Sequence, residues 1–501
     1  MTTCQNSAGT TDFVILNEVK NLYSDTIVAP ATTPGTGAIS IVRISGPDTF
    51  RIVDAVVKLT NGSISTSAAY TIHYGEVFVI PSEASVSQSE LLDQVLVSVF
   101  RAPHSYTGED SVEISTHASA YIVSELIRLL IEAGCRMAEP GEFTRRAFLN
   151  GKMDLAQAEA VADVISATNS ASHKVAMNQL RGGFSKELEG LRKELLEMAS
   201  LLELELDFSE EEVEFADREK LQELVKGTLA HVEKLASSFR QGNMVKNGVP
   251  VAIVGAVNAG KSSLLNSLLG EDRAIVSDIA GTTRDTIEEV LHLDGIAFRF
   301  IDTAGIRESA DTVEKIGIEK TYEKISSAAV VLAVLSLSDT LTDFKANLEQ
   351  ICSRIDTTSQ ALFLLLNKAD LLSSNDINNF VITSNSIVKN LGKQAVILPI
   401  SAKTGLGLEE LKKALSKAQK ELLTTDSGTL VTNLRHYQAL TEGAAALRRT
   451  LKALSDGIPT DLVAEDLRAA TASVNLILGR DLGLSPETVL HNIFANHCIG
   501  K

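Results

Sequence analysis

A glycine-rich segment near the middle of the chain has the residue types that bind phosphate. It reads GAVNAGKS, from Gly255 to Ser262, and lies between VPVAIV and SSLLNSLLG, a pattern that predicts a strand, a tight loop and a helix. Glycines let backbone N–H groups close around phosphate oxygens, and the N-terminus of the helix adds its dipole. We expect Lys261 to contact the β- and γ-phosphates and Ser262 to ligate Mg²⁺.

Two further segments complete a predicted phosphate and magnesium site. DTAG, from Asp302 to Gly305, follows the apolar run IAFRFI, and GTTRD, from Gly281 to Asp285, lies where a mobile switch segment belongs. We expect Asp302 to hold the magnesium shell through water and the Gly305 amide to sense the γ-phosphate. Thr283 is the candidate for a second magnesium hydroxyl ligand, engaged when the triphosphate is bound.

The segments NKAD, from Asn367 to Asp370, and SAK, from Ser401 to Lys403, specify the base. The Asp370 carboxylate matches guanine N1–H and the exocyclic amine, a donor pair that adenine lacks. We expect Asn367 and Lys368 to support the loop and ring, and the Ala402 amide to donate to the guanine oxygen. The nucleotide is therefore predicted to be GTP. The complete predicted GTP-binding set is Asn258, Ala259, Gly260, Lys261, Ser262, Ser263, Ser277, Asp278, Ile279, Ala280, Gly281, Thr282, Thr283, Asp302, Thr303, Ala304, Gly305, Asn367, Lys368, Asp370, Ser401, Ala402 and Lys403.

Hydrolysis must use groups other than the glutamine that often follows DxxG, because Ile306 stands there. Asn258, inside the phosphate loop, could ligate a monovalent cation that neutralises charge in the transition state. Glu314 is an acidic candidate for positioning the attacking water. The residues alone leave both roles open, since an exposed helix glutamate is the ordinary interpretation of Glu314.

Composition sets limits on the function. The chain has 501 residues, enough for two to four domains, with 44% hydrophobic and 22% charged residues, as in a soluble protein. Its apolar runs are too short to span a bilayer, no export signal is evident, and four scattered cysteines fit a reducing cytosol. A net charge of −18 argues against broad nucleic-acid binding, although a local basic surface could still bind a structured RNA.

The pattern along the chain predicts a multidomain α/β protein in which a Ras-like P-loop G domain is inserted into a discontinuous helical domain. We expect a disordered extension over 1–25, an α+β domain over 26–150, helical parts over 151–247 and 424–501, and the G domain over 248–423. Within the first helical part, five apolar residues recur at helical spacing and predict one buried seam. These are Leu188, Leu191, Leu195, Met198 and Leu202.

The segments outside the G domain resemble those of one family. IVAPATTPGTGAISIVRISG near the start, YTGEDSVEI from Tyr106, PGEFTRRAFLNGKMDLAQAEAVADVI from Pro140 and the terminal CIGK from Cys498 are similar to the tRNA-modification GTPase family MnmE, also called TrmE. The resemblance runs from about Thr26 to Lys501, and the GEFT…RAFLNGK…DLAQAEA string is specific to that family.

The resemblance implies roles for residues that spacing alone does not assign. Arg43, Glu113, Lys152 and Lys501 match positions that bind a tetrahydrofolate one-carbon carrier, in an N-terminal domain that also dimerises. Asn258, Ser277, Ile279 and Thr282 match potassium ligands, Glu314 matches the residue that positions water, and Cys498 matches a cysteine needed for modification. The pterin's amine edge suits a glutamate acceptor, and the folate's carboxylates suit arginine and lysine.

The family also implies partners. Its members act as homodimers with an FAD-dependent partner, MnmG or GidA, which carries the flavin, and install an aminomethyl-type group on C5 of the wobble uridine of certain tRNAs. We therefore expect a cytoplasmic, potassium-stimulated GTPase with no membrane partner. Two alternatives stay open from sequence: a ribosome-assembly GTPase switch without small-molecule chemistry, and a structural GTPase whose N-terminal domain only dimerises.

Overall fold

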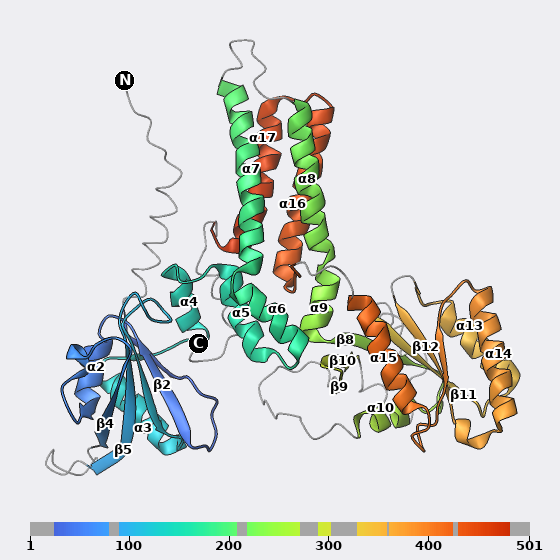
Figure 1. The fold of residues 1–501 in the computed structure, drawn as a ribbon, viewed down its shortest axis with the longest axis horizontal. Coiled ribbons are helices and arrows are strands. Elements are labelled where there is room, and N and C mark those ends of the chain that lie inside the picture. Colours follow the sequence, from blue (N-terminus) through green and yellow to red (C-terminus); the bar gives the residue numbers. More distant parts are fainter. Residues whose placement is uncertain are drawn as a thin grey trace. The chain divides into compact units, whose positions relative to one another are not determined.

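The structure is a computed structural model that describes residues 25–79, 90–207, 218–270, 289–301, 328–357, 360–423 and 429–480. The chain divides into two compact units (Figure 1). The first combines the described residues of 1–166, 176–233 and 438–501, and the second those of 167–175 and 234–437. The division falls within α6 (Ser170–Leu180), α8 (Arg218–Ser237) and α16 (Leu434–Ser455).

The first unit begins with a seven-stranded sheet in the order β3-β4-β5-β6-β2-β1-β7. All neighbouring strands are antiparallel except the parallel pair β1 and β7. The strands are β1 (Ile27–Pro30), β2 (Ile39–Ser45), β3 (Val57–Leu59), β4 (Thr71–Val79), β5 (Glu90–Phe100), β6 (Ser111–His117) and β7 (Arg136–Met137). IVAP and ISIVRIS, inside the N-terminal segment quoted above, thus form strands β1 and β2.

One face of this sheet is a hydrophobic core. Because side chains alternate along a strand, β4, β5 and β6 direct one set of apolar residues towards helices α2 (Thr49–Val56) and α3 (Ala120–Glu132). Val97, Val99 and Ile114 are fully buried there against Ile52 and Leu126. A short 3₁₀ helix, η1 (Ile64–Thr66), lies beside α2.

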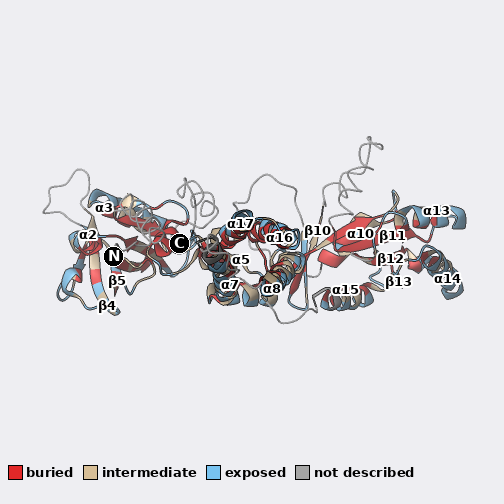
Figure 2. Ribbon diagram, turned by 90° about the horizontal axis from the view of Figure 1, so that it is seen from above, coloured by how far each residue is buried: buried red, intermediate tan, exposed pale blue. Residues whose placement is uncertain are grey.

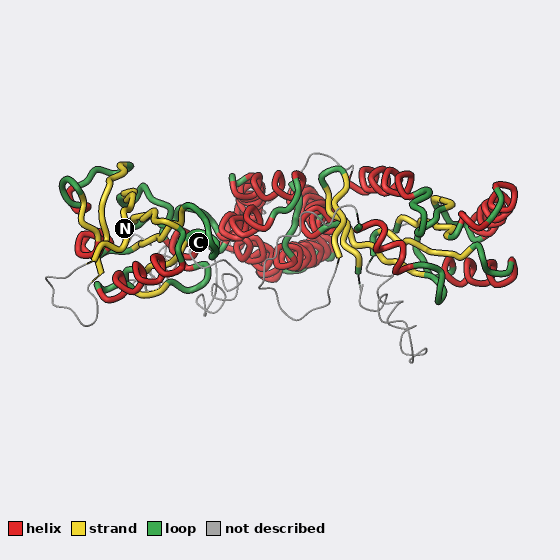
Figure 3. Tube along the Cα trace, turned by 90° about the horizontal axis from the view of Figure 1, so that it is seen from below, coloured by secondary structure: helices red, strands yellow, loops and turns green. Residues whose placement is uncertain are grey.

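The other described elements of the first unit are helices, which Figure 3 draws in red. Its further helices are α4 (Glu142–Leu149), α5 (Leu155–Ser166), α7 (Gly183–Asp207) and α17 (Thr460–Leu478). The seam predicted on α7 is confirmed: all five of its apolar residues are buried. α7 packs along α17, and Arg192 on α7 donates to Asn475 Oδ1 at 2.8 Å.

The second unit is a six-stranded sheet in the order β13-β12-β11-β8-β10-β9, parallel except for the β9–β10 pair. Its strands are β8 (Val249–Val254), β9 (Glu289–Leu293), β10 (Ile296–Phe300), β11 (Val330–Ser336), β12 (Ala361–Asn367) and β13 (Val396–Pro399). Its helices are α9 (Phe239–Asn247), α10 (Lys261–Leu269), α13 (Leu341–Cys352), η5 (Ala369–Leu371), α14 (Ser374–Asn390) and α15 (Leu408–Leu423).

Helices cover both faces of this sheet, so its central strand β11 is buried along its whole length (Figure 2). Along β11, Leu332 and Val334 belong to a core with α10 and α15, while Val331 and Leu335 belong to a second core with α13 and α14. The three-layered α/β unit, together with the α+β sheet and the helices, confirms the predicted fold class.

Within the second unit, the segment before β8 and the segment after α15 contact each other. Val431 N donates to Ser238 Oγ at 3.1 Å, and the rings of Phe239 and Tyr437 stack with centroids 4.7 Å apart. At Gly242 on α9, an added Cβ would lie 2.1 Å from Val431 O. Glycine is therefore required there by close approach of the backbone.

None of the described helices is long and apolar enough to cross a membrane.

Candidate functional site

The phosphate loop joins β8 to α10 with a backbone that requires glycine. Gly255 has φ +153° and Gly260 has φ +99°, and a Cβ at Gly255 would lie 2.2 Å from Val334 O. Asn258 also has a positive φ of 62°, a conformation that asparagine tolerates better than most residues. The loop thus presents the backbone and the start of α10, whose first amide groups have no partner within a helix.

Lys261, the first residue of α10, is held by the loop itself. Its ammonium donates to Gly255 O and Ala256 O, each at 2.9 Å. Burial lowers the pKa of this amine, since desolvation penalises the charged form. A bound phosphate would supply stronger, charged acceptors for the same ammonium.

Asn367 links the phosphate loop to the base-binding loops. Its Nδ2 donates to Ala259 O at 2.8 Å, and its Oδ1 accepts from Ala402 N at 3.0 Å. The Ala402 amide, predicted to donate to guanine, thus has a protein acceptor in this structure. Lys368 has φ +68° and begins the turn that carries Asp370, whose side chain is exposed.

These residues surround one cavity of about 410 Å³ in the second unit. Every lining residue except Leu371 belongs to the predicted GTP-binding set. The lining is Asn258, Gly260, Lys261, Ser262, Ser263, Asn367, Lys368, Asp370, Leu371, Ser401, Ala402 and Lys403. Leu371 is 65% exposed and lines the cavity beside Asp370. Its position directly after NKAD is the sequence feature that could have identified it.

The Ser262 hydroxyl lies at this cavity and has the chemistry expected of a magnesium ligand. Asn258 is likewise placed at the cavity with an amide oxygen suited to a monovalent cation. In the described ranges, no group of three or more His, Cys, Asp or Glu side chains could hold a metal ion. Several predicted residues lie outside the described residues, namely Ser277 to Thr283, Asp302 to Gly305, Glu314, Cys498 and Lys501.

Two predicted folate-binding residues form a direct pair on the first unit's sheet. Arg43 on β2 and Glu113 on β6 are opposite each other in register, and Arg43 Nε and Nη2 donate to Glu113 Oε1 at 3.0 and 2.8 Å. The guanidinium carbon also lies 5.3 Å from the Tyr106 ring centroid and 5.7 Å from that of Phe143. Sequence analysis did not identify these two aromatic residues, which orient Arg43.

Lys152, the third predicted folate residue, contacts the loop that carries Tyr106. Its Nζ donates to Pro103 O at 2.9 Å, and Asn150 Nδ2 donates to Thr107 O at 2.8 Å. The segment from Arg101 to Asp110 therefore borders both Lys152 and the Arg43–Glu113 pair. The structure brings Arg43, Glu113 and Lys152, the described residues predicted to bind folate, to one part of the first unit.

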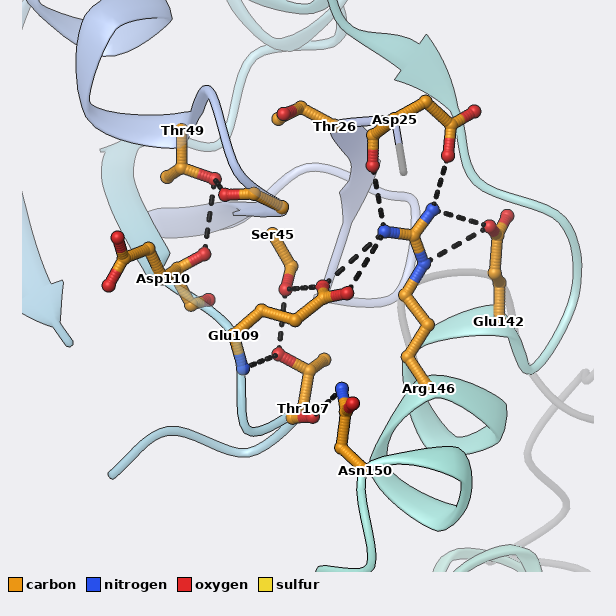
Figure 4. Close-up of polar contacts among 12 residues, drawn as sticks. Asp25, Thr26, Ser45, Thr49, Thr107, Glu109, Asp110, Glu142, Arg146 and Asn150 are labelled. Carbon is orange, nitrogen blue, oxygen red and sulfur yellow. Dashed lines mark hydrogen bonds and ion pairs between the residues drawn. The ribbon is translucent and has the colours of Figure 1, made fainter. Parts of the chain in front are cut away.

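A buried ion network supports this region (Figure 4). Arg146 on α4 is 1% exposed and donates to Asp25 O at 2.8 Å, Asp25 Oδ1 at 2.7 Å and Glu142 Oε1 at 3.0 Å. It also reaches Glu109 Oε2 at 3.3 Å, and Ser45 Oγ donates to that oxygen at 2.7 Å. Arg146 thereby connects α4 with the Arg101–Asp110 segment. The sequence signal was the GEFTRR string, whose acid and bases share one short helix.

The network shifts the pKa values of its acids. Burial alone would raise the pKa of Glu142, but the hydrogen bonds from Arg136 and the Glu139 amide, with the charge of Arg146, outweigh it and lower that pKa. The pKa of Asp25 is also lowered, since Arg136 and Arg146 outweigh the effect of burial. Both carboxylates are therefore held in the charged form.

The second unit defines the class of the protein. A mostly parallel sheet with a phosphate loop after its strand β8, a magnesium-type hydroxyl and a base loop carrying Asp370 make it a P-loop GTPase domain.

Comparison with known proteins gives the family. The model "MnmE helical domain" matches residues 155–498, and "GTP-binding protein TrmE N-terminus" matches residues 26–152. Curated proteins named "tRNA modification GTPase MnmE" from Flavobacterium johnsoniae and Parabacteroides distasonis are 49% and 45% identical, over 96% and 95% of this chain and 100% of each relative. The chain therefore belongs to the MnmE family of tRNA modification GTPases, which confirms the resemblance, and it is a GTPase.

Solved structures are similar over smaller parts. A GTP-binding protein from Sulfolobus solfataricus in complex with GDP is 18% identical, covers 46% of this chain and 67% of its own, and has a TM-score of 0.27. The FeoB G-domain from Methanococcus jannaschii is 26% identical, covers 34% of this chain and 97% of its own, and has a TM-score of 0.23. These scores are too low to add to the description of the fold.

Proposed function

We propose that this GTPase is cytoplasmic and stimulated by potassium, and that it works with an FAD-dependent partner of the MnmG or GidA type. Together they install an aminomethyl or carboxymethylaminomethyl group at C5 of the tRNA wobble uridine, using a tetrahydrofolate one-carbon unit. The flavin belongs to the partner. The folate supplies the one-carbon unit, and this chain's residues bind and orient it.

The clustering of Arg43, Glu113 and Lys152 around the Arg101–Asp110 segment carries this proposal. The hydrogen bonds that Arg43 makes to Glu113 both go to Oε1, so Oε2 is the atom we expect to accept from the pterin's amine edge. Lys152 is exposed and its ammonium suits a carboxylate of the folate tail. Lys501, outside the described residues, would add a second cation.

The same face of the sheet supports the proposal of a homodimer. The face that carries Arg43 and Glu113 also carries four exposed apolar side chains, on β2, β4 and β5. They are Ile39 (67% exposed), Ile72 (67%), Tyr74 (45%) and Leu96 (49%). A second copy would bury these side chains beside the folate residues, which a monomer would leave in water.

In the GTPase cycle we assign Mg²⁺ to Ser262 and Thr283, and K⁺ to Asn258, Ser277, Ile279 and Thr282. K⁺ would neutralise negative charge that develops during hydrolysis, and Glu314 would position the attacking water, since Ile306 has no group for this task. Cys498 would serve the modification reaction.

Titration calorimetry with 5-formyltetrahydrofolate on the full-length protein tests the folate site. We expect the wild type to bind, and Glu113→Gln to weaken binding at least about 10-fold, since a charged acceptor is lost. Glu76→Gln is the matched control, because Glu76 lies on the same sheet face on β4 and should leave binding unchanged. Absence of binding by the wild type would remove the main support for the modification reaction and favour a GTPase switch without small-molecule chemistry.

Hydrolysis rates in potassium and sodium test the cation. We expect several-fold faster turnover in potassium, and Asn258→Ala should abolish that difference. Glu314→Ala should lower turnover with nearly unchanged GTP affinity. Equal rates in the two salts would contradict the potassium site, and a parallel loss of affinity would give Glu314 a structural role.

A further inference from the structure

Ser267 lies in the last turn of α10, outside the nucleotide-binding motifs. Its Oγ donates to Ala402 O at 2.6 Å, across 135 residues of sequence. α10 begins at the phosphate loop, whereas Ala402 belongs to the loop expected at the guanine 6-oxygen. One hydroxyl therefore ties the helix behind the phosphates to the loop at the base.

The backbone carbonyl and amide of Ala402 both make hydrogen bonds to side chains. The carbonyl accepts from Ser267, and the amide donates to Asn367 Oδ1 at 3.0 Å. Ala402 is 7% exposed, so water replaces these partners poorly, and a buried peptide group without a partner is costly. Asn367 also bonds to Ala259 O, which makes one polar chain from α10 through Ala402 to the phosphate loop.

We propose that Ser267 is a positioning residue for guanine recognition. It fixes the Ala402 peptide so that the backbone of residues 401–403 meets the 6-oxygen of the base. Asn367 would then share or exchange the Ala402 amide when the nucleotide binds. This role rests on GTP binding at the cavity and is independent of the folate site.

Ser267→Ala tests the proposal. Loss of one neutral hydrogen bond should accelerate dissociation of a fluorescent GDP analogue about 3- to 10-fold. Ser267→Thr, which retains a hydroxyl, should restore most of the wild-type rate. If Ser267→Ala folds poorly, Ser267→Cys keeps the shape with a weaker donor and should give an intermediate rate.

The matched control is Ser384→Ala in α14, where a buried serine donates to Phe380 O of its own helix at 2.8 Å. This change removes a comparable hydrogen bond at a residue that does not line the nucleotide cavity. We expect the dissociation rate to stay at the wild-type value. A rate increase equal to that of Ser267→Ala would show a general loss of stability and overturn the proposal.

6-Thio-GDP distinguishes a positioning role of Ser267 from a general packing role, because its sulfur at position 6 accepts hydrogen bonds weakly while the rest of the base is unchanged. The sulfur and the Ser267→Ala substitution would weaken the same contact, that between position 6 of the base and the backbone of residues 401–403. Ser267→Ala should therefore weaken binding of 6-thio-GDP less than about 2-fold, while it weakens binding of GDP about 3- to 10-fold. Equal weakening of both nucleotides, or an unchanged GDP dissociation rate, would overturn the proposal.

Discussion

The predicted nucleotide site and the group of residues predicted to bind folate (Arg43, Glu113 and Lys152, here called the folate-side cluster) are built in different ways. In the second unit, the shape of the phosphate loop depends on the backbone of Gly255 and Gly260. In the first unit, Arg43 and Glu113 are 70 residues apart and meet through strand pairing. A backbone site is encoded locally and is therefore visible as a motif, whereas a side-chain site depends on register and on the groups that support it.

The two sites also differ in how charge is handled. At the nucleotide cavity Asp370 is exposed, and the Lys261 ammonium donates only to neutral carbonyls among the described contacts. Behind the folate-side residues, Arg146, Glu142 and Asp25 already satisfy one another within the protein. At the nucleotide cavity, charged side chains are therefore available to a ligand. Beside the folate-side cluster, the buried pair of Arg146 and Glu142 instead stabilises the protein itself.

Among the variants below, we expect Arg146→Met to cause the largest loss of unfolding free energy. It leaves the buried Glu142 and the partly buried Glu109 without one of their cations, and breaking a buried network costs about 3–5 kcal/mol of unfolding free energy. Urea unfolding measures the loss. Arg128→Met is the control, since Arg128 is 44% exposed and pairs with Glu125 and Glu132 on the surface of α3, and should change stability by less than about 1 kcal/mol. Equal effects of the two variants would refute a supporting role for the network.

Asp370→Ala should affect the ligand and not the fold. Loss of two hydrogen bonds to a charged acceptor should weaken GDP binding about 10- to 100-fold, with little change in melting temperature. The control is Asp376→Ala, an exposed carboxylate that accepts from Ser373 Oγ at 2.7 Å at the start of α14. If Asp376→Ala weakened GDP binding as much, base recognition could not be assigned to Asp370.

Gly242→Ala tests the contact between the segment before β8 and the segment after α15. The new Cβ would lie 2.1 Å from Val431 O, so the backbone must shift at a cost of about 1–3 kcal/mol. Gly227→Ala on α8 meets nothing within 4 Å and should stabilise the protein by up to about 1 kcal/mol. Thermal unfolding should therefore move in opposite directions for the two variants, and a shared direction would contradict the close approach.

Acid should weaken the first unit through Glu142 and Asp25. Because the folded-state pKa values of these groups are lowered, their contribution to stability is present at neutral pH and is lost as pH falls through the folded pKa. The urea midpoint should drop on going below about pH 4.5, and the drop should be smaller in Arg146→Met, which has lost part of the cause. If the urea midpoint of Arg146→Met depended on pH as strongly as that of the wild type, Arg146 would not cause the acid sensitivity.

Cys135 and Cys352, the cysteines among the described residues, are both buried and give the smallest expected effect, on chemical labelling. Burial raises the pKa of Cys135 to about 12 and that of Cys352 to about 11, so the reactive thiolate is scarce at pH 8. Iodoacetamide should leave both residues unmodified in the native protein and label them in urea, as peptide mass spectrometry would report. Ser237→Cys, at an exposed position on α8, should react under native conditions. Native labelling of Cys135 would contradict its burial.

Sequence predicted the nucleotide site more fully than the folate-side cluster, and the structure explains why. The glycine loop, Asn367 and Asp370 are encoded by short motifs, and strand β8 was predicted from the apolar run VPVAIV before the loop. Arg43 and Glu113 were assigned through family resemblance, because only strand register brings them together. Arg146 and Ser267 were missed, since burial and a contact across 135 residues leave no local pattern.

The most direct test of the proposed function is mass spectrometry of tRNA nucleosides from cells that lack this protein. We predict loss of the C5-aminomethyl-type wobble uridines, restoration by the wild-type chain, and no restoration by Lys261→Ala, which removes the phosphate-loop ammonium. An unchanged set of wobble uridines in cells without the protein would contradict the proposed role in tRNA modification.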